Sequence, residues 1–418
     1  MEDKPGGKEE LGRGQEGGVG GQITYCVTGA TGYVGSWLVK SLLDKGYRVH
    51  ATVRDPEKAW HFLKKWEGGE RLRLFRADLF EEGSFDDAVR GCHGVFHVAA
   101  TMQFSVPVEE NVESHVQTSI IKPAIKGTLN VLKACLKSNS VRRVVFTSSI
   151  STITSKNGSG KWRDIVDESC KIPMDQVWKN RPSGWVYLLA KLLTEEAAFQ
   201  FTKENGIDLV SVISTAVAGP FLTPTVPTSI QVLLSPLTGD GQLLPIVDAV
   251  NARMGLIPLA HIDDVSRAHI FLMEHSGAEG PYICCSGSSG IAELIDCLIK
   301  AYPFSNLKRP ETDECKSIPV EISTKKLRGL GFEFKHDVQD IIHRTVEECM
   351  ACEFLKPSQN NHATKHTENI KDPTCNLHIA PAVPTFDLAD ATVPPKKLKI
   401  KGNHITVLSS LFAILSVR

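Results

Sequence analysis

The stretch Ile23-Thr-Tyr-Cys-Val-Thr-Gly-Ala-Thr-Gly-Tyr-Val-Gly35 lies near the start of this 418-residue chain and decides its fold. Its beginning predicts a short buried strand, and three glycines follow at three-residue spacing. Gly29 permits the tight turn out of the strand, and Gly32 lets the backbone approach a pyrophosphate closely. Gly35 leaves room where the next helix presses on the sheet. The stretch therefore predicts the first turn of a dinucleotide-binding unit.

A helix and a second strand complete this unit. Residues 36–45 carry an apolar stripe, Gly46 ends the helix, and residues 49–53 read as the second strand. The N-terminus of the helix offers unpaired N–H groups and a positive dipole end to a phosphate. Flexible loops also produce glycine triplets, so the prediction depends on strand, glycines, amphipathic helix and strand following in this order.

Strand-like and helix-like segments alternate through the rest of the chain. Strands are expected at 72–76, 94–98, 143–147, 208–213, 256–261 and 282–285. Helices are expected at 84–89, 120–137, 184–204, 265–274, 291–301, 323–330 and 337–352. This alternation predicts an α/β fold, a doubly wound parallel sheet of the Rossmann type with right-handed crossovers and a smaller C-terminal substrate-binding lobe.

The domain organisation follows from the same pattern. Residues 1–22 are expected to be a disordered extension and residues 23–215 the Rossmann domain. Residues 216–357 are expected to form the substrate lobe, interleaved with returning Rossmann elements, and its proline-broken start is expected to cover a substrate. Residues 358–418 read as a disordered tail. Membrane association is expected only through the apolar run at 404–417, which is shorter than the roughly 20 residues of a membrane helix.

Composition excludes several classes of function. A net charge of -1 gives no field that would gather nucleic acid, so no nucleic-acid partner is expected. The 11 cysteines are scattered along the chain, which is typical of a protein from a reducing compartment, and a cytoplasmic location is expected. Cys349 and Cys352 form a lone CxxC pair without a second pair or a histidine cluster, so no metal site is expected.

A second group of residues points to catalysis. Tyr187 and Lys191 stand four apart in a predicted helix, so they share one face. An ammonium one turn away is expected to favour the phenolate of Tyr187, which could then exchange a proton with a carbonyl oxygen. Ser148 and Ser149 end a predicted strand, where a hydroxyl would face the ligand crevice; solvation of a loop or capping of a helix is the alternative.

Three motifs together identify a resemblance. Thr28-Gly-Ala-Thr-Gly-Tyr-Val-Gly35, Val145-Phe-Thr-Ser-Ser149 and Tyr187-Leu-Leu-Ala-Lys191 resemble the extended short-chain dehydrogenase/reductases. With Gly219-Pro-Phe221 and His261-Ile-Asp-Asp-Val265, the sequence resembles, more narrowly, plant dihydroflavonol reductases and anthocyanidin reductases. The resemblance covers about residues 23–352.

The resemblance implies roles for matching positions. Ser149 would polarise the substrate oxygen, Tyr187 would act as acid and base, and Lys191 would hold the nicotinamide ribose and tune Tyr187. Cofactor contacts would also come from the glycine turn, the adenine and ribose edges and the nicotinamide side. These contacts are Gly29, Thr31, Gly32, Tyr33, Val34, Gly35, Asp78, Leu79, Val98, Ala99, Ser214 and Val217.

Arg54 bears on the choice of cofactor. It follows the second strand, where the family pairs a cation with the 2′-phosphate of NADP, and a guanidinium suits that dianion. Lys58 is expected to assist. Asp55 is a complication, since an acid about twenty residues past the glycines is typical of NAD sites. Because Arg54 comes first after the strand, the sequence favours NADP. An exposed charge at the end of a strand is the alternative interpretation.

Departures from the family limit the substrate. The Asn that helps to grip flavonoid ring hydroxyls in dihydroflavonol reductases is replaced by Thr154, which has one hydroxyl in place of an amide. The Pro-Thr pair on the cofactor side is replaced by Ser214-Thr215. Anthocyanidin reductases often have Ala where this chain keeps Gly35. The Asn-Trp-Tyr-Cys-Tyr motif of cinnamoyl-CoA reductases is absent before Tyr187, which argues against a CoA thioester.

The sequence therefore predicts an NADPH-dependent oxidoreductase that reduces a carbonyl on a flavonoid-like or related phenolic ketone. One alternative is a nucleotide-sugar epimerase or dehydratase of the same fold, against which Arg54 argues. Another is a catalytically idle NADP-binding regulator, against which the complete Ser149, Tyr187 and Lys191 set argues. Either a monomer or a dimer is compatible with the sequence.

Overall fold

The computed structural model describes residues 23–63, 66, 68–101, 112–303, 305, 307 and 320–356. The predicted N-terminal extension, the tail from residue 358 and its apolar run lie outside the described residues. Within the described part of the chain, no helix combines the length and the apolar character needed to cross a membrane.

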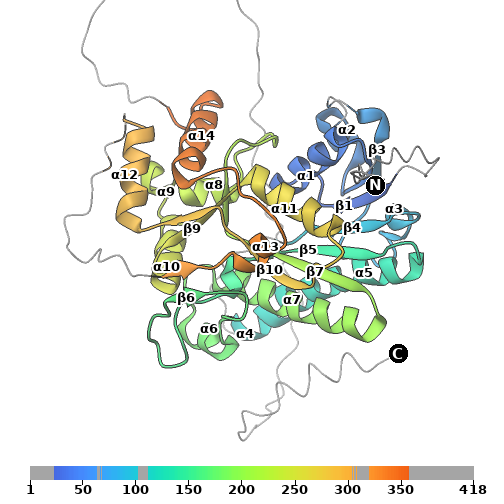
Figure 1. Ribbon diagram of the computed structural model, residues 1–418, viewed down its shortest axis with the longest axis horizontal. Helices are drawn as coiled ribbons and strands as arrows, with labels where there is room; N and C mark the ends of the chain where they lie inside the picture. The colour runs from blue at the N-terminus through green and yellow to red at the C-terminus, as the bar shows by residue number, and fades with distance from the viewer. Residues whose placement is uncertain are drawn as a thin grey trace, which may run out of the picture. The chain divides into compact units, whose positions relative to one another are not determined.

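A seven-stranded parallel sheet forms the centre of the fold (Figure 1), in the order β10-β7-β5-β4-β1-β2-β3. Its strands are β1 (Thr24–Thr28), β2 (Arg48–Val53), β3 (Leu72–Arg76), β4 (Gly94–His97), β5 (Arg143–Ser149), β7 (Asp208–Ser214) and β10 (Gly280–Cys284). The predicted doubly wound α/β fold is confirmed. The strand order reverses between β1 and β4, so a crevice opens at their carboxyl ends.

Helices cover both faces of this sheet. On one face α1 (Tyr33–Asp44) packs against α11 (Ile262–Glu274), and alternate strand residues such as Val27 and Val145 face them. On the other face α3 (Asp86–Val89) and α7 (Trp185–Asn205) pack against α5 (Lys122–Ser138). Because both faces are covered, the central strands β5 and β7 are buried at all but one position each.

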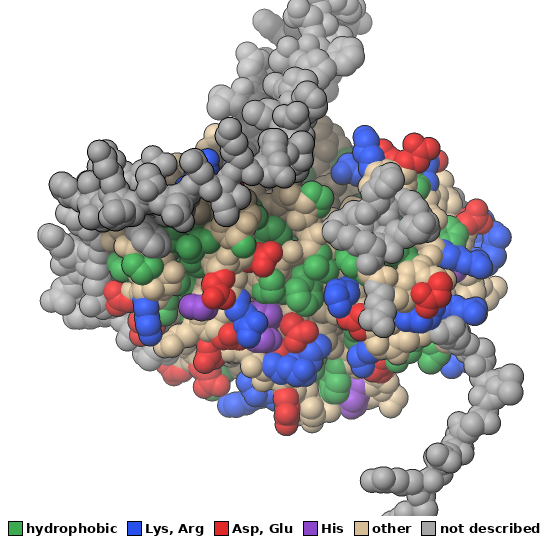
Figure 2. Space-filling model, turned by 90° about the horizontal axis from the view of Figure 1, so that it is seen from above, with side chains coloured by type: hydrophobic (Ala, Val, Ile, Leu, Met, Phe, Trp, Pro, Cys, Tyr) green, Lys and Arg blue, Asp and Glu red, His purple; other side chains and the backbone are tan. Residues whose placement is uncertain are grey.

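A smaller lobe lies beyond β7. Its three-stranded sheet has the order β11-β9-β8. The strands are β8 (Ala216–Ala218), β9 (Ile257–His261) and β11 (Gly287–Ser289). The helices α8 (Thr228–Leu233), α10 (Leu244–Met254), α12 (Ile291–Ala301) and α14 (Val338–Ala351) share a hydrophobic core with this sheet. Viewed from above, hydrophobic side chains gather in the middle of one face of the molecule, with charged side chains around them (Figure 2).

The expected helices and strands from 72 to 352 are present, with bounds shifted by at most three residues. The proline-broken stretch after residue 215 differs, because it contains two short helices, α8 and α9 (Ser235–Thr238). Pro227 stands at the N-cap of α8, and Pro236 lies in the first turn of α9. The N–H groups at the start of a helix have no partner within the helix, so proline, which lacks an N–H, is accommodated there.

Candidate active site

The glycine turn after β1 brings two chain segments very close together. Gly29 has φ +70°, and a Cβ there would lie 3.0 Å from the Cα of Ala99, which follows β4. A Cβ on Gly35 would lie 2.2 Å from the carbonyl oxygen of Gly29. Since both neighbours are backbone atoms, a side chain at either position requires the turn to move.

The N-terminus of α1 is open to an anion. Its N-cap is Gly32, no side chain caps it, and its first turn carries no acid. Gly32 N donates to Gly29 O at 3.0 Å, and Ser36 N donates to Gly32 O at 2.8 Å, so the turn leads directly into the helix. Uncapped N–H groups and the helix dipole fit a pyrophosphate.

A buried polar chain holds the turn after β4. Thr28 Oγ1 accepts hydrogen bonds from Val98 N at 3.1 Å and Ala99 N at 3.0 Å, and it lies 2.9 Å from His97 Nδ1. With two bonds accepted, the Thr28 hydroxyl donates to Nδ1, so His97 Nε2 carries the ring proton and donates to Thr128 Oγ1 at 2.9 Å. Burial, and secondarily the charge of Lys191, lowers the pKa of His97 to about 3, which keeps the ring neutral.

Sequence reasoning missed this chain of bonds. Its only signal was a polar residue at the end of each of two predicted strands, Thr28 on β1 and His97 on β4. The two residues are direct partners in the sheet register, which the sequence alone does not specify.

The charged residues after β2 separate into two groups. The carboxylate of Asp55 accepts from Lys58 N at 3.2 Å and pairs with Lys58 Nζ at 3.2 Å. These hydrogen bonds hold the pKa of Asp55 below its usual value. Arg54 is exposed and, among the described residues, forms no ion pair. Asp55 is thus engaged with the first turn of α2 (Pro56–Leu63), and Arg54 carries the charge available to a ligand.

The turn after β3 is also fixed by hydrogen bonds. Asp78 N donates to Ser84 Oγ at 3.1 Å, and Ser84 Oγ donates to Asp78 O at 2.9 Å. Asn130 of α5 donates from Nδ2 to Leu79 O at 2.9 Å. Asp78 and Leu79, the predicted border of the adenine, therefore lie on a rigid turn at the carboxyl end of the sheet.

The structure brings the three predicted catalytic residues to one place. Ser149 is the last residue of β5, and its side chain is hydrogen-bonded to that of Tyr187 on α7. Lys191 lies one turn further along α7, where its Nζ donates to Thr147 O at 3.0 Å and lies 5.6 Å from the centre of the Phe146 ring. Ser149 Oγ also accepts from Ser151 N at 3.2 Å.

The protonation of Tyr187 differs from the sequence expectation. Burial raises the pKa of Tyr187, and the hydrogen bond with Ser149 opposes this rise. Burial thus outweighs the effect expected from the Lys191 ammonium, whose Nζ is directed to the Thr147 carbonyl of β5. Burial also lowers the pKa of Lys191 to about 8, against the charge of Glu195, which raises it.

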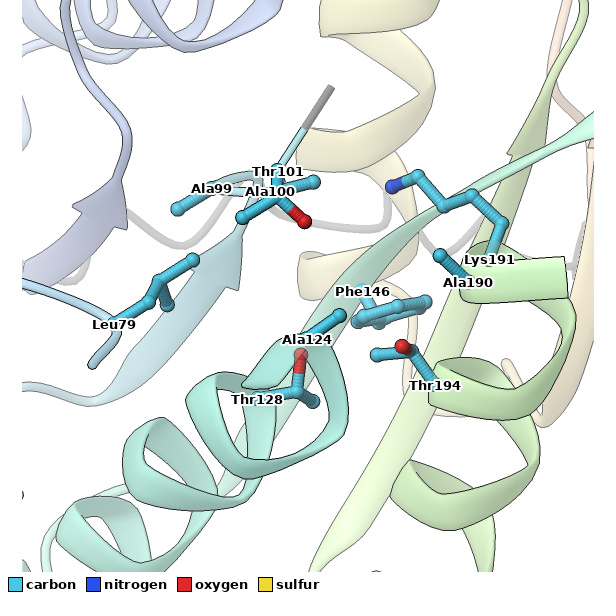
Figure 3. Close-up of a pocket in the computed structure, with 10 residues that line it drawn as sticks. All are labelled: Leu79, Ala99, Ala100, Thr101, Ala124, Thr128, Phe146, Ala190, Lys191 and Thr194. Carbon is cyan, nitrogen blue, oxygen red and sulfur yellow. The ribbon is translucent and has the colours of Figure 1, made fainter. Parts of the chain in front are cut away.

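A pocket connects Lys191 with the turn after β4 (Figure 3). Lys191, Ala190 and Thr194 of α7 lie on one side of it, opposite the segment Ala99-Ala100-Thr101. Phe146 of β5 and Leu79 also line the pocket. Since Ala99 touches the glycine turn, the pocket extends from the predicted cofactor residues to Lys191.

The family follows from comparison with known proteins. The NAD dependent epimerase/dehydratase family matches residues 25–285.

The chain belongs to this family.

Relatives place it more narrowly. A Ginkgo biloba protein named as an anthocyanidin reductase is 45% identical over 331 residues, which cover 78% of this chain and 94% of the relative. A bifunctional dihydroflavonol 4-reductase/flavanone 4-reductase of Malus domestica is 42% identical, with 78% and 90% covered. Within the family, the chain is a member of the dihydroflavonol and anthocyanidin reductase group of extended short-chain dehydrogenase/reductases.

Two solved structures are similar. Vestitone reductase from alfalfa has a TM-score of 0.65 and 34% identity, covering 79% of this chain and 99% of that one. Gre2 of Candida albicans in complex with NADPH has a TM-score of 0.65 and 26% identity, with the same coverage.

The positions where this family member departs from the dihydroflavonol reductase motif lie beside the predicted catalytic residues. Thr154 is buried, and its Oγ1 accepts from Lys156 N at 3.2 Å, so the hydroxyl serves a local turn. Ser214 Oγ donates to Ser148 O at 3.1 Å, which ties the ends of β7 and β5 together. Val217 is buried in the core cluster of the sheet face covered by α1.

The remaining predicted residues lie around the crevice or outside it. Tyr33 OH donates to Gly219 O at 3.1 Å, which links the start of α1 to the smaller lobe. Cys349 is buried in α14, and Cys352, just after the helix, is exposed with Sγ directed to Cys349 O. The CxxC pair is thus part of a helix end remote in the sequence from the glycine turn and the Tyr187 motif.

Proposed function

We propose that this chain is an NADPH-dependent reductase that converts the carbonyl of a flavonoid-like or related phenolic ketone to an alcohol. The observation that supports the proposal most strongly is the hydrogen bond between Ser149 and Tyr187, one helical turn from Lys191, which lines the pocket that reaches Ala99. The reductases named above act on flavonoids, and their lengths are covered almost completely by this chain.

The cofactor residues fit NADPH. Gly29, Gly32 and Gly35 leave the backbone space that a pyrophosphate needs at the N-terminus of α1. Arg54 would hold the 2′-phosphate, while Asp55 is engaged by Lys58 and so does not oppose that charge. Lys191 would hold the nicotinamide ribose. When bound, NADPH supplies the hydride that the carbonyl carbon receives.

The protein's own groups handle the proton. The raised pKa of Tyr187 keeps its hydroxyl protonated at neutral pH, so it can donate to the oxygen on which negative charge develops. Ser149 is bonded to that same hydroxyl and would orient the substrate oxygen toward it. The charge of Lys191 stabilises the phenolate that remains until a proton from solvent replaces the one donated.

The experiment is a screen of NADPH consumption with dihydroflavonols, anthocyanidins, flavanones and simple aryl ketones. Tyr187→Phe removes the proton donor and is expected to lower kcat by about 10²- to 10⁴-fold while the Kd for NADPH stays at the wild-type value. A Phe variant that turns over at the wild-type rate contradicts the role of Tyr187. NADPH binding without consumption of any ketone points to the idle regulator.

The compartment and the oligomeric state are further parts of the proposal. Nine described cysteines are free thiols, which supports a reducing compartment, and we propose the cytoplasm. The reaction needs one protomer only, since every proposed catalytic residue comes from one chain.

A further inference from the structure

Glu195 is a buried carboxylate that the proposed chemistry leaves without a role. It lies one helical turn beyond Lys191 on the same face of α7, and its side chain is only 3% exposed. Both carboxylate oxygens are engaged. Oε1 accepts from Ser211 Oγ of β7 at 2.6 Å, and Oε2 pairs with Lys171. Burial of an anion is costly unless it is paired and hydrogen-bonded, so this arrangement holds the charge in place.

Lys171 belongs to the segment that follows the catalytic Ser149. We call residues 150–172 the strap. Its two ends lie side by side, since Thr154 N donates to Cys170 O and Ile172 N donates to Thr152 O, each at 2.9 Å. The ion pair of Lys171 with Glu195 therefore ties the strap to α7, the helix that carries Tyr187 and Lys191.

The charged groups around Lys191 give Glu195 a second effect. Nζ of Lys191 is bonded to the neutral carbonyl of Thr147, and burial disfavours its positive charge. The titratable groups that face it are Tyr187 and Glu195 on α7 and His97 on β4, and burial keeps the ring of His97 neutral. Among the described residues, Glu195 is thus the anion whose charge favours the ammonium form. Glu196, the next residue, interacts with Lys171 and Glu195.

We propose that Glu195, held by Lys171, is a positioning residue: its carboxylate keeps Lys191 charged beside the pocket, and its ion pair fixes the strap next to Ser149. This inference rests on the proposed function, because it assigns Glu195 a role through Lys191. The electrostatic part also applies to the protein without cofactor, and it can be measured there.

The first test compares pH profiles. Glu195→Gln keeps the size of the side chain and a partner for Ser211, but removes the charge. The alkaline limb of kcat/KM is expected to move to lower pH by about 1 unit, and Glu195→Asp, which restores the charge, is expected to move it back. Glu204→Gln makes the same change at an exposed position of α7 and is the matched control. An unchanged limb in Glu195→Gln overturns the proposal.

The second test needs no activity. In Glu195→Gln, Lys191 is charged without its anion, so its folded-state pKa falls further below that of an unfolded lysine. The unfolded chain then binds more protons, and stability rises with pH. The Tm deficit of this variant relative to wild type should therefore narrow between about pH 6 and pH 9. A deficit that stays constant over this range indicates lost packing alone and overturns the electrostatic role.

Lys171→Met is an independent variant that should shift the alkaline limb of kcat/KM in the opposite direction. Without Lys171, the charge of Glu195 acts on Lys191 unscreened, so the alkaline limb should move to higher pH. The released strap should raise KM for the ketone several-fold, with the Kd for NADPH unchanged. If Lys171→Met has the same alkaline limb of kcat/KM and the same KM as wild type, the proposal is overturned. If wild type consumes NADPH, Tyr187→Phe does not, and the Glu195 and Lys171 variants behave as wild type, this inference fails while the proposed function stands.

Discussion

The glycine turn and the region around the strap are held together in different ways. The turn is closed by backbone hydrogen bonds between residues three or four positions apart, from Gly32 N to Gly29 O and from Ser36 N to Gly32 O, and Ala30 N also donates to Thr52 O of β2. Around the strap and the smaller lobe, side chains accept hydrogen bonds from backbone groups of distant segments. Glu168 Oε1 accepts from Ile283 N at 2.8 Å, and Thr345 Oγ1 accepts from Gly219 N at 2.8 Å, across 115 and 126 positions.

This difference indicates where each region is sensitive. The glycine turn depends on the absence of side chains, because backbone atoms occupy the space that a Cβ would need. The strap and the smaller lobe depend on the presence of particular polar side chains, because each satisfies a backbone group from another element. An added side chain should therefore damage the glycine turn, whereas the removal of a polar group should damage the strap and the smaller lobe.

Among these predictions, the largest effect is expected for Gly29→Ala, which should weaken the binding of NADPH. A left-handed backbone costs an alanine about 1–2 kcal/mol, and the new Cβ would also press on Ala99, so the Kd for NADPH should rise more than about tenfold. Gly46→Ala is the matched control, since φ there is +85° and no atom lies within 4 Å of the added Cβ. Fluorescence titration with NADPH measures both. Equal NADPH affinities in the two variants would contradict the close-approach explanation.

Arg54→Gln tests whether a single side chain matters in a region made mainly of backbone. A lost charged hydrogen bond is worth about 1.5–3 kcal/mol, so the preference for NADPH over NADH should fall by about 10- to 100-fold. Steady-state kinetics with both cofactors measure the ratio. Arg90→Gln, at an exposed residue that pairs with Asp87, should leave the preference unchanged. Loss of affinity for both cofactors alike would rule out contact with the 2′-phosphate.

Thr345→Val tests the smaller lobe by removing a buried hydroxyl. Thr345 Oγ1 donates to Ile341 O and accepts from Gly219 N, so valine leaves a buried N–H without a partner and should destabilise the protein by about 1–3 kcal/mol. Thr202→Val is the matched control, because the buried Thr202 hydroxyl serves carbonyls of its own helix only. Urea unfolding compares the two. A larger loss in Thr202→Val would argue against the role of the long-range bond.

The smallest expected effect concerns pH, which should change kcat/KM for the ketone more than the binding of NADPH. Lys191, with its pKa lowered to about 8, is charged below that pH and loses its charge as the pH rises through it. We expect kcat/KM for the ketone to be constant near pH 7 and to fall by up to about tenfold per unit above pH 8. The Kd for NADPH should change less than kcat/KM, since the backbone N–H groups at the start of α1 do not titrate in this range. A rise in the Kd for NADPH as steep as the fall in kcat/KM would contradict this separation.

The local part of the fold could be predicted from the sequence. The period of apolar residues fixes a strand at 72–76 and a helix at 291–301, both of which the structure confirms without a shift. The glycine spacing predicts a turn that only residues without a Cβ can form, and the family membership is confirmed. The roles of Ser149, Tyr187 and Lys191 stay predictions, although the structure places these side chains together.

What only the tertiary structure decided depends on burial and on distant partners. Sequence spacing placed the ammonium of Lys191 near Tyr187. In the structure, burial sets the direction in which the pKa of Tyr187 shifts, and Lys191 is hydrogen-bonded to strand β5. The link from Thr28 through His97 and the ion pair of Glu195 join elements whose register no local pattern specifies. The apolar period and the turn conformation depend on neighbours in the sequence, whereas close contacts, desolvation and hydrogen bonding depend on every segment that folds around a group.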